Sequence, residues 1–238
     1  MESGREVRPE VPATASNVRL VVTHTHRHGP GLRERKKLKT RSCLIEAALT
    51  VAERQGYEST TVEQIADTAE VSARTFARYF PTKSGVFESL LHEVTVAANV
   101  ELERVPADVP PLRALRAAQL AMLRGSPETP GRLSPHRLVR LLHVLSNSPS
   151  LRLMAVQVRT RDTTRAIARR LDKPIHDRPV RLTAEIWATV VGDALEGLAE
   201  KPFPAADDVW AITEFERLVV ANFDALIAIA AELHEEPH

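Results

Sequence analysis

The chain has 238 residues and a net charge of +1, with 43% hydrophobic and 26% charged residues, which is typical of a globular protein with one large or two ordinary domains. Aromatic residues make up only 4% and Cys43 is the single cysteine, which favours an aliphatic helical core and excludes a disulfide framework or a cysteine-based zinc site. No apolar run approaches the roughly 18–20 residues of a membrane span, and the N-terminus lacks the apolar core of a secretory signal, so we expect a cytoplasmic protein with no membrane partner.

Residues 1–30 contain three prolines and no apolar periodicity, which predicts a disordered N-terminal arm. His24, His26 and His28 alternate within this arm and could hold a divalent metal. Three imidazoles in an unstructured tail more often have no ligand. We therefore predict neither a metal nor any other cofactor.

The positive charge is concentrated in one short segment. Between Arg27 and Arg41 the basic residues are opposed only by Glu34, whereas acidic and basic residues are almost equal in number from Val96 onward. A basic segment beside a neutral body suggests a polyanionic partner for the first part of the chain. A solvated tail with no partner is the alternative on charge alone.

A first helix is predicted from about Leu32 or Lys36 to Gln55, where Gly56 stops it. Its apolar residues recur at helical spacing: Leu44, Ala48, Val51 and Ala52. Cys43 lies within this apolar stretch, and we expect it to be a small core residue and not a nucleophile.

Two short helices follow. Thr61 is the predicted N-cap of the first, and Gln64 three residues later completes a capping box. Ser72 is the predicted N-cap of the second, which reaches Phe80. Two short helices joined by a tight turn are the unit that places a helix in the DNA major groove, so residues 61–80 predict a helix-turn-helix.

Proline residues separate the remaining elements. Pro81 ends the third helix, and Thr82 caps a fourth that runs to about Arg104. Further helices are predicted at about 112–123, 135–145, 149–171, 178–200 and 206–232, with a loop at 125–131. No segment shows strand alternation, and the predicted fold class is all-α.

The third helix has two distinct faces on a helical wheel. Phe76 and Phe80 share one face and must pack inward. Arg74 and Arg78 lie roughly opposite, where they can reach guanine edges or phosphates. An ordinary amphipathic surface helix has the same pattern, so this helix alone does not decide between the two interpretations.

A wider window decides in favour of DNA binding. Residues 31–94 combine a basic lead-in with IEAA, then TTVEQIA, VSARTF and YFPTKS, in that order. This combination resembles the N-terminal domain of the TetR family of bacterial repressors. The resemblance implies a homodimer that binds a palindromic double-stranded operator, with the third helix of each subunit in the major groove. Residues 105–238 contain no recognisable catalytic constellation, so we expect no enzyme activity.

The resemblance also implies which residues contact DNA. The groove and phosphate contacts of the family fall on Ala73, Arg74, Thr75, Ala77, Arg78 and Tyr79, with Lys83 at the start of the next helix and Thr61 and Glu63 on the second helix. The hydroxyl of Tyr79 could donate to a phosphate. A basic residue in a first helical turn, as at Lys83, opposes the helix dipole unless a phosphate is near.

Three residues depart from the family pattern. Glu70 stands where the family usually has glycine in the turn, and a positive φ there would cost on the order of 1 kcal/mol. Ala77 replaces a bulky aromatic residue, which puts its contact in doubt. Gly85 stands where an acidic residue often completes a capping box.

The remaining residues, 96–238, are predicted to form a ligand-binding and dimerisation domain beside a DNA-binding domain at 31–95. The resemblance implies that helices 178–200 and 206–232 pair with those of a second subunit. Residues 146–171 resemble the ligand domain of family members that sense acyl-CoA-like molecules. Met122, Met154 and Trp187 are candidates for an apolar effector pocket, with ordinary core packing as the alternative.

Three functions follow from these patterns. The leading hypothesis is a dimeric repressor released by a small apolar or amphipathic ligand of unknown identity. A DNA-binding protein without a ligand is the second, and a small-molecule enzyme with a DNA-binding module is the third. A cavity of a few hundred Å³ within residues 105–238 would favour the first over the second. Converging polar groups with perturbed pKa values in that cavity would favour the third.

Overall fold

The computed structural model describes residues 31–125, 133–204 and 208–232. These residues form nine helices and no strand, which confirms the all-α prediction. The predicted arm at 1–30, with its three histidines, lies outside the described residues. No helix within the described ranges is both long enough and apolar enough to cross a membrane.

Each helix lies close to its predicted range. The helices are α1 (Leu32–Gln55), α2 (Val62–Thr68), α3 (Ala73–Tyr79), α4 (Lys83–Leu102), α5 (Pro111–Arg124), α6 (Pro135–Ser146), α7 (Pro149–Leu171), α8 (Arg178–Ala199) and α9 (Asp208–Glu232). The predicted start of the last helix at 206 falls within the undescribed residues 205–207. Proline occupies the first or second position of α5, α6, α7 and α8, where its missing N–H costs no helical hydrogen bond.

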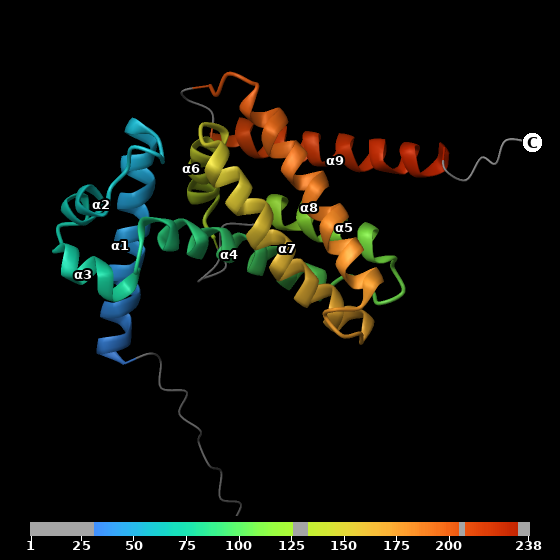
Figure 1. The fold of residues 1–238 in the computed structure, drawn as a ribbon, viewed down its shortest axis with the longest axis horizontal. Coiled ribbons are helices and arrows are strands. Elements are labelled where there is room, and N and C mark those ends of the chain that lie inside the picture. Colours follow the sequence, from blue (N-terminus) through green and yellow to red (C-terminus); the bar gives the residue numbers. More distant parts are fainter. Residues whose placement is uncertain (1–30, 126–132, 205–207, 233–238) are drawn as a thin grey trace, which may run out of the picture.

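The helices form two groups connected by α4. Helices α1, α2 and α3 lie together at one end of the molecule, and α4 runs from them into the body formed by α5–α9 (Figure 1). Within the body, α7 lies beside α8, α8 beside α9, and α4 packs on both α5 and α7. The C-terminal half of α9 projects beyond the other helices (Figure 1).

A continuous apolar core extends from the first group into the body. Phe76 and Phe87 are fully buried, and the rings of Tyr57 and Phe87 meet edge to face with centroids 5.0 Å apart. Burial of each large apolar side chain contributes roughly 1.5–3 kcal/mol, so these rings fix α3 and α4 against α1.

The structure corrects the prediction for Cys43, which is exposed and not part of the core. The buried side of α1 is formed by Leu44, Ile45, Ala47, Ala48, Leu49, Val51 and Ala52. At about 100° per residue, position 43 falls just beyond the edge of that buried arc. Sequence proximity to apolar residues therefore misled the prediction.

Candidate nucleic-acid interface

Side-chain caps fix the start of both short helices. Thr61 Oγ1 accepts a hydrogen bond from the backbone N–H of Gln64 at 3.3 Å, and the side-chain oxygen Oε1 of Gln64 accepts one from the backbone N–H of Thr61 at 2.9 Å. Ser72 Oγ accepts from the N–H of Thr75 at 3.1 Å. The predicted capping box and the predicted Ser72 cap are both present. Each such cap stabilises its helix by about 1 kcal/mol.

The turn between α2 and α3 contains a residue in the left-handed backbone conformation, although that residue is not glycine. Glu70 has φ +55°. The N–H of Glu70 donates to the carbonyl of Asp67 at 3.0 Å, and the N–H of Val71 donates to that of Ala66 at 2.9 Å. These two hydrogen bonds hold the tight turn, so the positive φ expected at this position occurs with a glutamate.

Helix α3 buries one face and exposes the other. Phe76 is fully buried, whereas Arg74 and Arg78 are exposed. The guanidinium of Arg78 lies 5.3 Å from the ring centre of the half-buried Tyr79, a cation–π distance. The other candidate contact residues also reach the surface: Ala73 and Ala77 are exposed and Thr75 is half-buried on α3, while Thr61 and Glu63 are exposed at the start of α2.

Lys83 already has partners within the chain. Its ammonium donates to the carbonyls of Tyr57 at 2.9 Å and Glu58 at 3.1 Å, and it lies 4.5 Å from the ring centre of Tyr57. These contacts connect the start of α4 to the loop after α1. They also explain, without a phosphate, how a basic residue is accommodated in the first turn of a helix.

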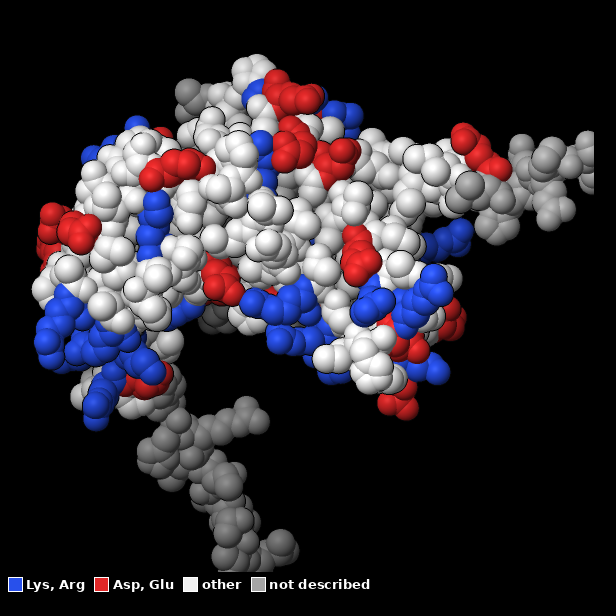
Figure 2. Space-filling view, in the orientation of Figure 1, with Lys and Arg blue, Asp and Glu red and all other residues white. Residues whose placement is uncertain are grey.

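A basic groove joins α1 to α3. It has a volume of about 800 Å³ and is lined by Gly31, Arg33, Glu34, Lys36, Lys37, Thr40, Arg78 and Tyr79. Lys and Arg side chains gather over this end of the molecule (Figure 2). The groove therefore places the basic start of α1 next to the exposed face of α3.

Two arginines of α6 attach the body to α1. Arg140 makes paired hydrogen bonds to the Glu53 carboxylate, at 2.9 Å from Nε and 2.7 Å from Nη2, and its Nη1 donates to Glu46 at 2.7 Å. Arg137 donates to Glu46 at 2.6 Å and to Ser42 at 2.9 Å. Hydrogen bonds to Glu53 above all hold the pKa of Arg140 above its usual value. We call Arg137, Arg140, Glu46 and Glu53 the α1–α6 clasp.

A second connection reaches the loop that Lys83 contacts. Ser148 and Ser150, at the start of α7, donate to Glu58 Oε1 at 2.6 and 2.8 Å. The hydrogen bond from Ser148 is the main cause that lowers the pKa of the Glu58 carboxyl. The body therefore contacts both α1 and the loop that precedes α2.

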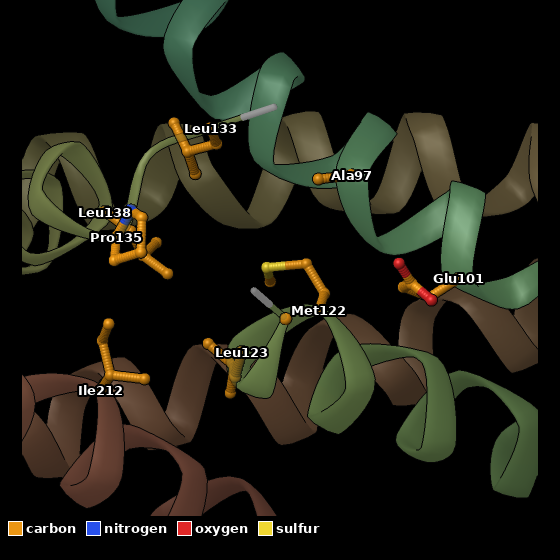
Figure 3. Close-up of a pocket in the computed structure, with 9 residues that line it drawn as sticks. Ala97, Glu101, Met122, Leu123, Leu133, Pro135, Leu138 and Ile212 are labelled. Atoms are coloured by element: carbon orange, nitrogen blue, oxygen red, sulfur yellow. The ribbon is translucent and has the colours of Figure 1, made fainter. Parts of the chain in front are cut away.

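Two small cavities adjoin Met122 within the body. The first holds about 30 Å³ and lies among Ala97, Glu101, Met122, Leu123, Gly125, Leu133, Pro135, Leu138 and Ile212 (Figure 3). The second holds about 20 Å³ and is also lined by Met122 and Leu138, together with leucines of α6. Each has room for a water molecule or two and not for an organic ligand. These two cavities therefore do not provide the few hundred Å³ that would favour a ligand-binding protein.

The three candidate pocket residues do not lie together around these cavities. Met122 lines both. Trp187 is 2% exposed and packs against the ring of Phe223, and the half-buried Met154 packs against the core; neither lines the two cavities. The second cavity instead contains two polar side chains that the sequence analysis missed, Gln119 and Arg159. Arg159 follows Leu151 and Ala155 at core spacing on α7, and this pattern could have revealed it.

Comparisons with known proteins identify relatives among bacterial transcriptional regulators. Residues 44–90 match the family model of bacterial regulatory proteins of the tetR family. The HTH-type transcriptional regulator TcmR of Streptomyces glaucescens is 45% identical over 101 residues, which cover 42% of this chain and 45% of that protein. The uncharacterized HTH-type transcriptional regulator YvkB of Bacillus subtilis is 33% identical over 70 residues, which cover 29% and 37%. The chain thus matches less than half of the length of these relatives.

Solved structures of low sequence identity are also similar. The fatty acid degradation regulator FadR from Bacillus halodurans aligns with a TM-score of 0.47 and 18% identity, over 76% of this chain and 94% of that one. SmeT, the repressor of a Stenotrophomonas maltophilia multidrug efflux pump, aligns with a TM-score of 0.46 and 20% identity, over 76% and 88%. The capped helices α2 and α3 lie within residues 44–90, so this part of the chain is the helix-turn-helix region of the TetR family of bacterial regulatory proteins.

Proposed function

We propose that this chain is a homodimeric, sequence-specific DNA-binding transcriptional repressor that a small apolar or amphipathic ligand releases from its operator. Residues 31–95 would form the DNA-binding domain and residues 96–238 the ligand-binding and dimerisation domain. The observation that carries the proposal is the arrangement of α3, where Arg74 and Arg78 are exposed opposite the buried Phe76 and beside a basic groove.

Helix α3 would enter the major groove with its arginine face. The small Ala73 and Ala77 on this face permit a close approach. Arg74 or Arg78 would read a guanine edge, since a guanidinium donates two hydrogen bonds to its O6 and N7 atoms. Thr61, Glu63, Thr75 and Tyr79 would flank this contact, and the basic start of α1 would lie near the phosphates.

Lys83 would contribute to DNA binding in a more limited way. Two of its three N–H donors are used by the carbonyls of Tyr57 and Glu58, which leaves one for a phosphate. Its replacement would therefore affect the stability of the loop as well as DNA affinity.

Helices α8 and α9 would form the dimer interface. From Ala225 to Ala231 helix α9 carries no polar residue, and both Ile227 and Ile229 are exposed. A groove of about 310 Å³ between the two helices is lined largely by apolar side chains such as Ile186 and Leu226. Exposed apolar surface of this kind marks a protein interface. A two-fold axis here would place two copies of α3 on a palindromic site.

Helix α6 would carry the signal from ligand to DNA. Its leucines, including Leu138 and Leu142, line the second cavity, and its arginines form the α1–α6 clasp. A ligand that separates the helices around Met122 would displace α6 and with it the clasp. Helix α1, which packs on α2 and α4, would then carry the DNA-binding domain to a different position.

The DNA-binding test begins with selection of an operator from a random duplex pool by the full chain. Fluorescence anisotropy on that operator and on a scrambled duplex follows, over a salt series. For at least one of Arg74 and Arg78, replacement by alanine should cost about 1–3 kcal/mol of binding free energy on the operator. The same replacement should cost much less on the scrambled duplex. The matched control is Arg113→Ala, which replaces an exposed arginine of α5 and should change the affinity for neither duplex.

Two further variants separate phosphate contacts from base contacts. Lys83→Ala should lower the affinity for both duplexes by the same factor. It should also reduce the slope of log K against log salt concentration by about one. Tyr79→Phe should also lower the affinity for both duplexes, but the slope of the salt dependence should change little because no charge is lost. If both Arg74→Ala and Arg78→Ala keep the operator-to-scrambled ratio of the wild type, α3 is not the recognition helix.

Light scattering tests the dimer. The full chain should have the mass of a dimer at micromolar concentration, and Ile227→Glu with Ile229→Glu should shift it toward the monomer. Val209→Glu provides a control, since Val209 is exposed at the opposite end of α9. A monomeric wild type would contradict the proposed interface.

A further inference from the structure

The second cavity combines an apolar lining with two buried polar side chains. Arg159 is 9% exposed and Gln119 only 1%, and both line a space otherwise bounded by apolar residues such as Leu142, Leu195 and Phe215. Arginine is rarely buried without an acidic partner, because removal of its charge from water is costly.

The protein satisfies these two side chains only in part. Arg159 Nη1 donates to Gln119 Oε1 at 3.1 Å. Among the described residues Arg159 has no carboxylate within ion-pair distance. Gln119 Nε2 is buried and has no hydrogen-bond partner. The cavity therefore presents several N–H donors and too few acceptors.

The nearest acid on the same helix is committed elsewhere. Asp162 accepts hydrogen bonds from His92 at 2.6 Å and Thr95 at 2.7 Å, both on α4, and its second oxygen lies 3.3 Å from Arg161. Burial lowers the pKa of Arg159 to about 10, which still leaves its guanidinium charged at neutral pH.

From this arrangement we propose that the effector is an apolar carboxylic acid whose carboxylate binds between Arg159 and Gln119. A carboxylate has two acceptor oxygens, one for the guanidinium and one for the unpartnered amide N–H₂ of Gln119. The apolar part of the acid would extend along the leucines of α6 toward the first cavity. This inference rests on the proposed function, because it takes the body as the ligand-binding domain.

Binding requires the body to open. The two cavities share Met122 and Leu138 as lining residues, and neither is large enough for an organic acid. Met122 is half-buried, unbranched and able to change rotamer at little cost. Its displacement would join the two cavities into one elongated site with the two donors at one end.

Calorimetry on the full chain without DNA tests the site directly. The probes are octanoate and 2-naphthoate, each compared with its uncharged alcohol, 1-octanol and 2-naphthylmethanol. We expect each carboxylate to bind once per protomer and about tenfold or more tighter than the corresponding alcohol. Arg159→Met should abolish this preference. Equal binding of acid and alcohol, a preference that survives in Arg159→Met, or no binding of either acid up to about 1 mM would overturn the proposal.

Thermal unfolding provides a second readout that needs no ligand. Gln119→Glu would supply the missing carboxylate from within the chain, so it should raise the melting temperature and weaken carboxylate binding. Arg159→Met should leave the melting temperature unchanged or higher, because a buried guanidinium with one hydrogen bond is replaced by an apolar side chain. Arg152→Met is the matched control on α7. Arg152 donates to Glu196 and to two carbonyls, so this control should be destabilised. If Arg159→Met loses as much stability as Arg152→Met, Arg159 is a structural residue and the proposal is overturned.

The carboxylate site and the proposed function can fail separately. Octanoate binding that depends on Arg159 but leaves operator affinity unchanged would support the site and contradict ligand release. Specific operator binding without any carboxylate preference would contradict the site and still support the DNA-binding part of the proposed function.

Discussion

The α1–α6 clasp predicts a strong energetic coupling between Arg140 and Glu53. Arg140 is only 15% exposed and Glu53 only 23%, and Nε and Nη2 of the guanidinium make paired hydrogen bonds to the carboxylate. We expect Arg140→Met and Glu53→Gln each to destabilise the chain, and the double variant to be little worse than Arg140→Met alone. The reason is that Arg140→Met already removes the interaction with Glu53, together with the contact to Glu46.

The magnitude follows from the geometry. A hydrogen bond between charged groups contributes about 1.5–3 kcal/mol where solvent is largely excluded. Because both side chains retain some exposure, the coupling energy should lie near the lower half of that range, at about 1.5–2 kcal/mol. For a chain of this size each kcal/mol corresponds to about 2–4 °C of melting temperature. Arg140→Met, which also loses its contact with Glu46, should therefore melt several degrees below the wild type.

A double-mutant cycle by chemical denaturation measures this coupling, at one fixed protomer concentration because a dimer links stability to concentration. Arg124 and Glu216 provide the control cycle. They also pair two helices, but Arg124 is 65% exposed, so their coupling should be clearly smaller. A coupling for Arg140 and Glu53 no larger than that of the control pair would refute the view that the clasp holds the body on α1.

Three further predictions concern single positions. Glu70→Gly should raise stability by about 0.5–1 kcal/mol, because glycine adopts the observed φ of +55° without strain, while Glu70→Ala should give no gain in the same denaturant titration. Gly85→Ala should also stabilise by about 0.5–1 kcal/mol, since a Cβ there would lie in ordinary contact 3.5 Å from Thr82 Oγ1 and alanine favours the helix; a loss of stability would contradict this. Asp162→Asn should be less stable than the wild type at neutral pH by an amount that shrinks in acid. Burial raises the pKa of Asp162, but hydrogen bonds from His92 and Thr95 and nearby positive charge outweigh it and hold this pKa below its ordinary 3.8. The carboxylate therefore stabilises the fold above that value and loses its effect as the pH falls through the lowered pKa, so a stability difference independent of pH down to pH 2 would disprove its contribution.

The features that the sequence predicted correctly depend on residues close together in the chain. The caps at Thr61 and Ser72 are formed by side chains three residues from their partners, and the inward face of α3 follows from the spacing of Phe76 and Phe80. Such interactions are determined by local geometry, so a single sequence suffices to predict them.

The features that could not be predicted from the sequence depend on contacts between segments far apart in the chain. Arg140 and Glu53 are 87 residues apart, and each alone resembles an ordinary charged surface residue. Gln119 and Arg159 lie on different helices, and their incomplete hydrogen bonding appears only when α5 and α7 are placed together. Cys43 shows the limit of local reasoning on a helix, because a shift of one position moves a side chain by 100° and out of the core.

The exposure of Cys43 gives this protein a built-in attachment point for a spectroscopic probe. It is the only cysteine in the chain and lies on the surface of α1, so a maleimide spin label or fluorophore would react at one known position without any substitution. A homodimer would then carry two identical labels, one on each DNA-binding domain. The distance between them, measured by double electron–electron resonance, would report directly how far those domains separate when an effector binds.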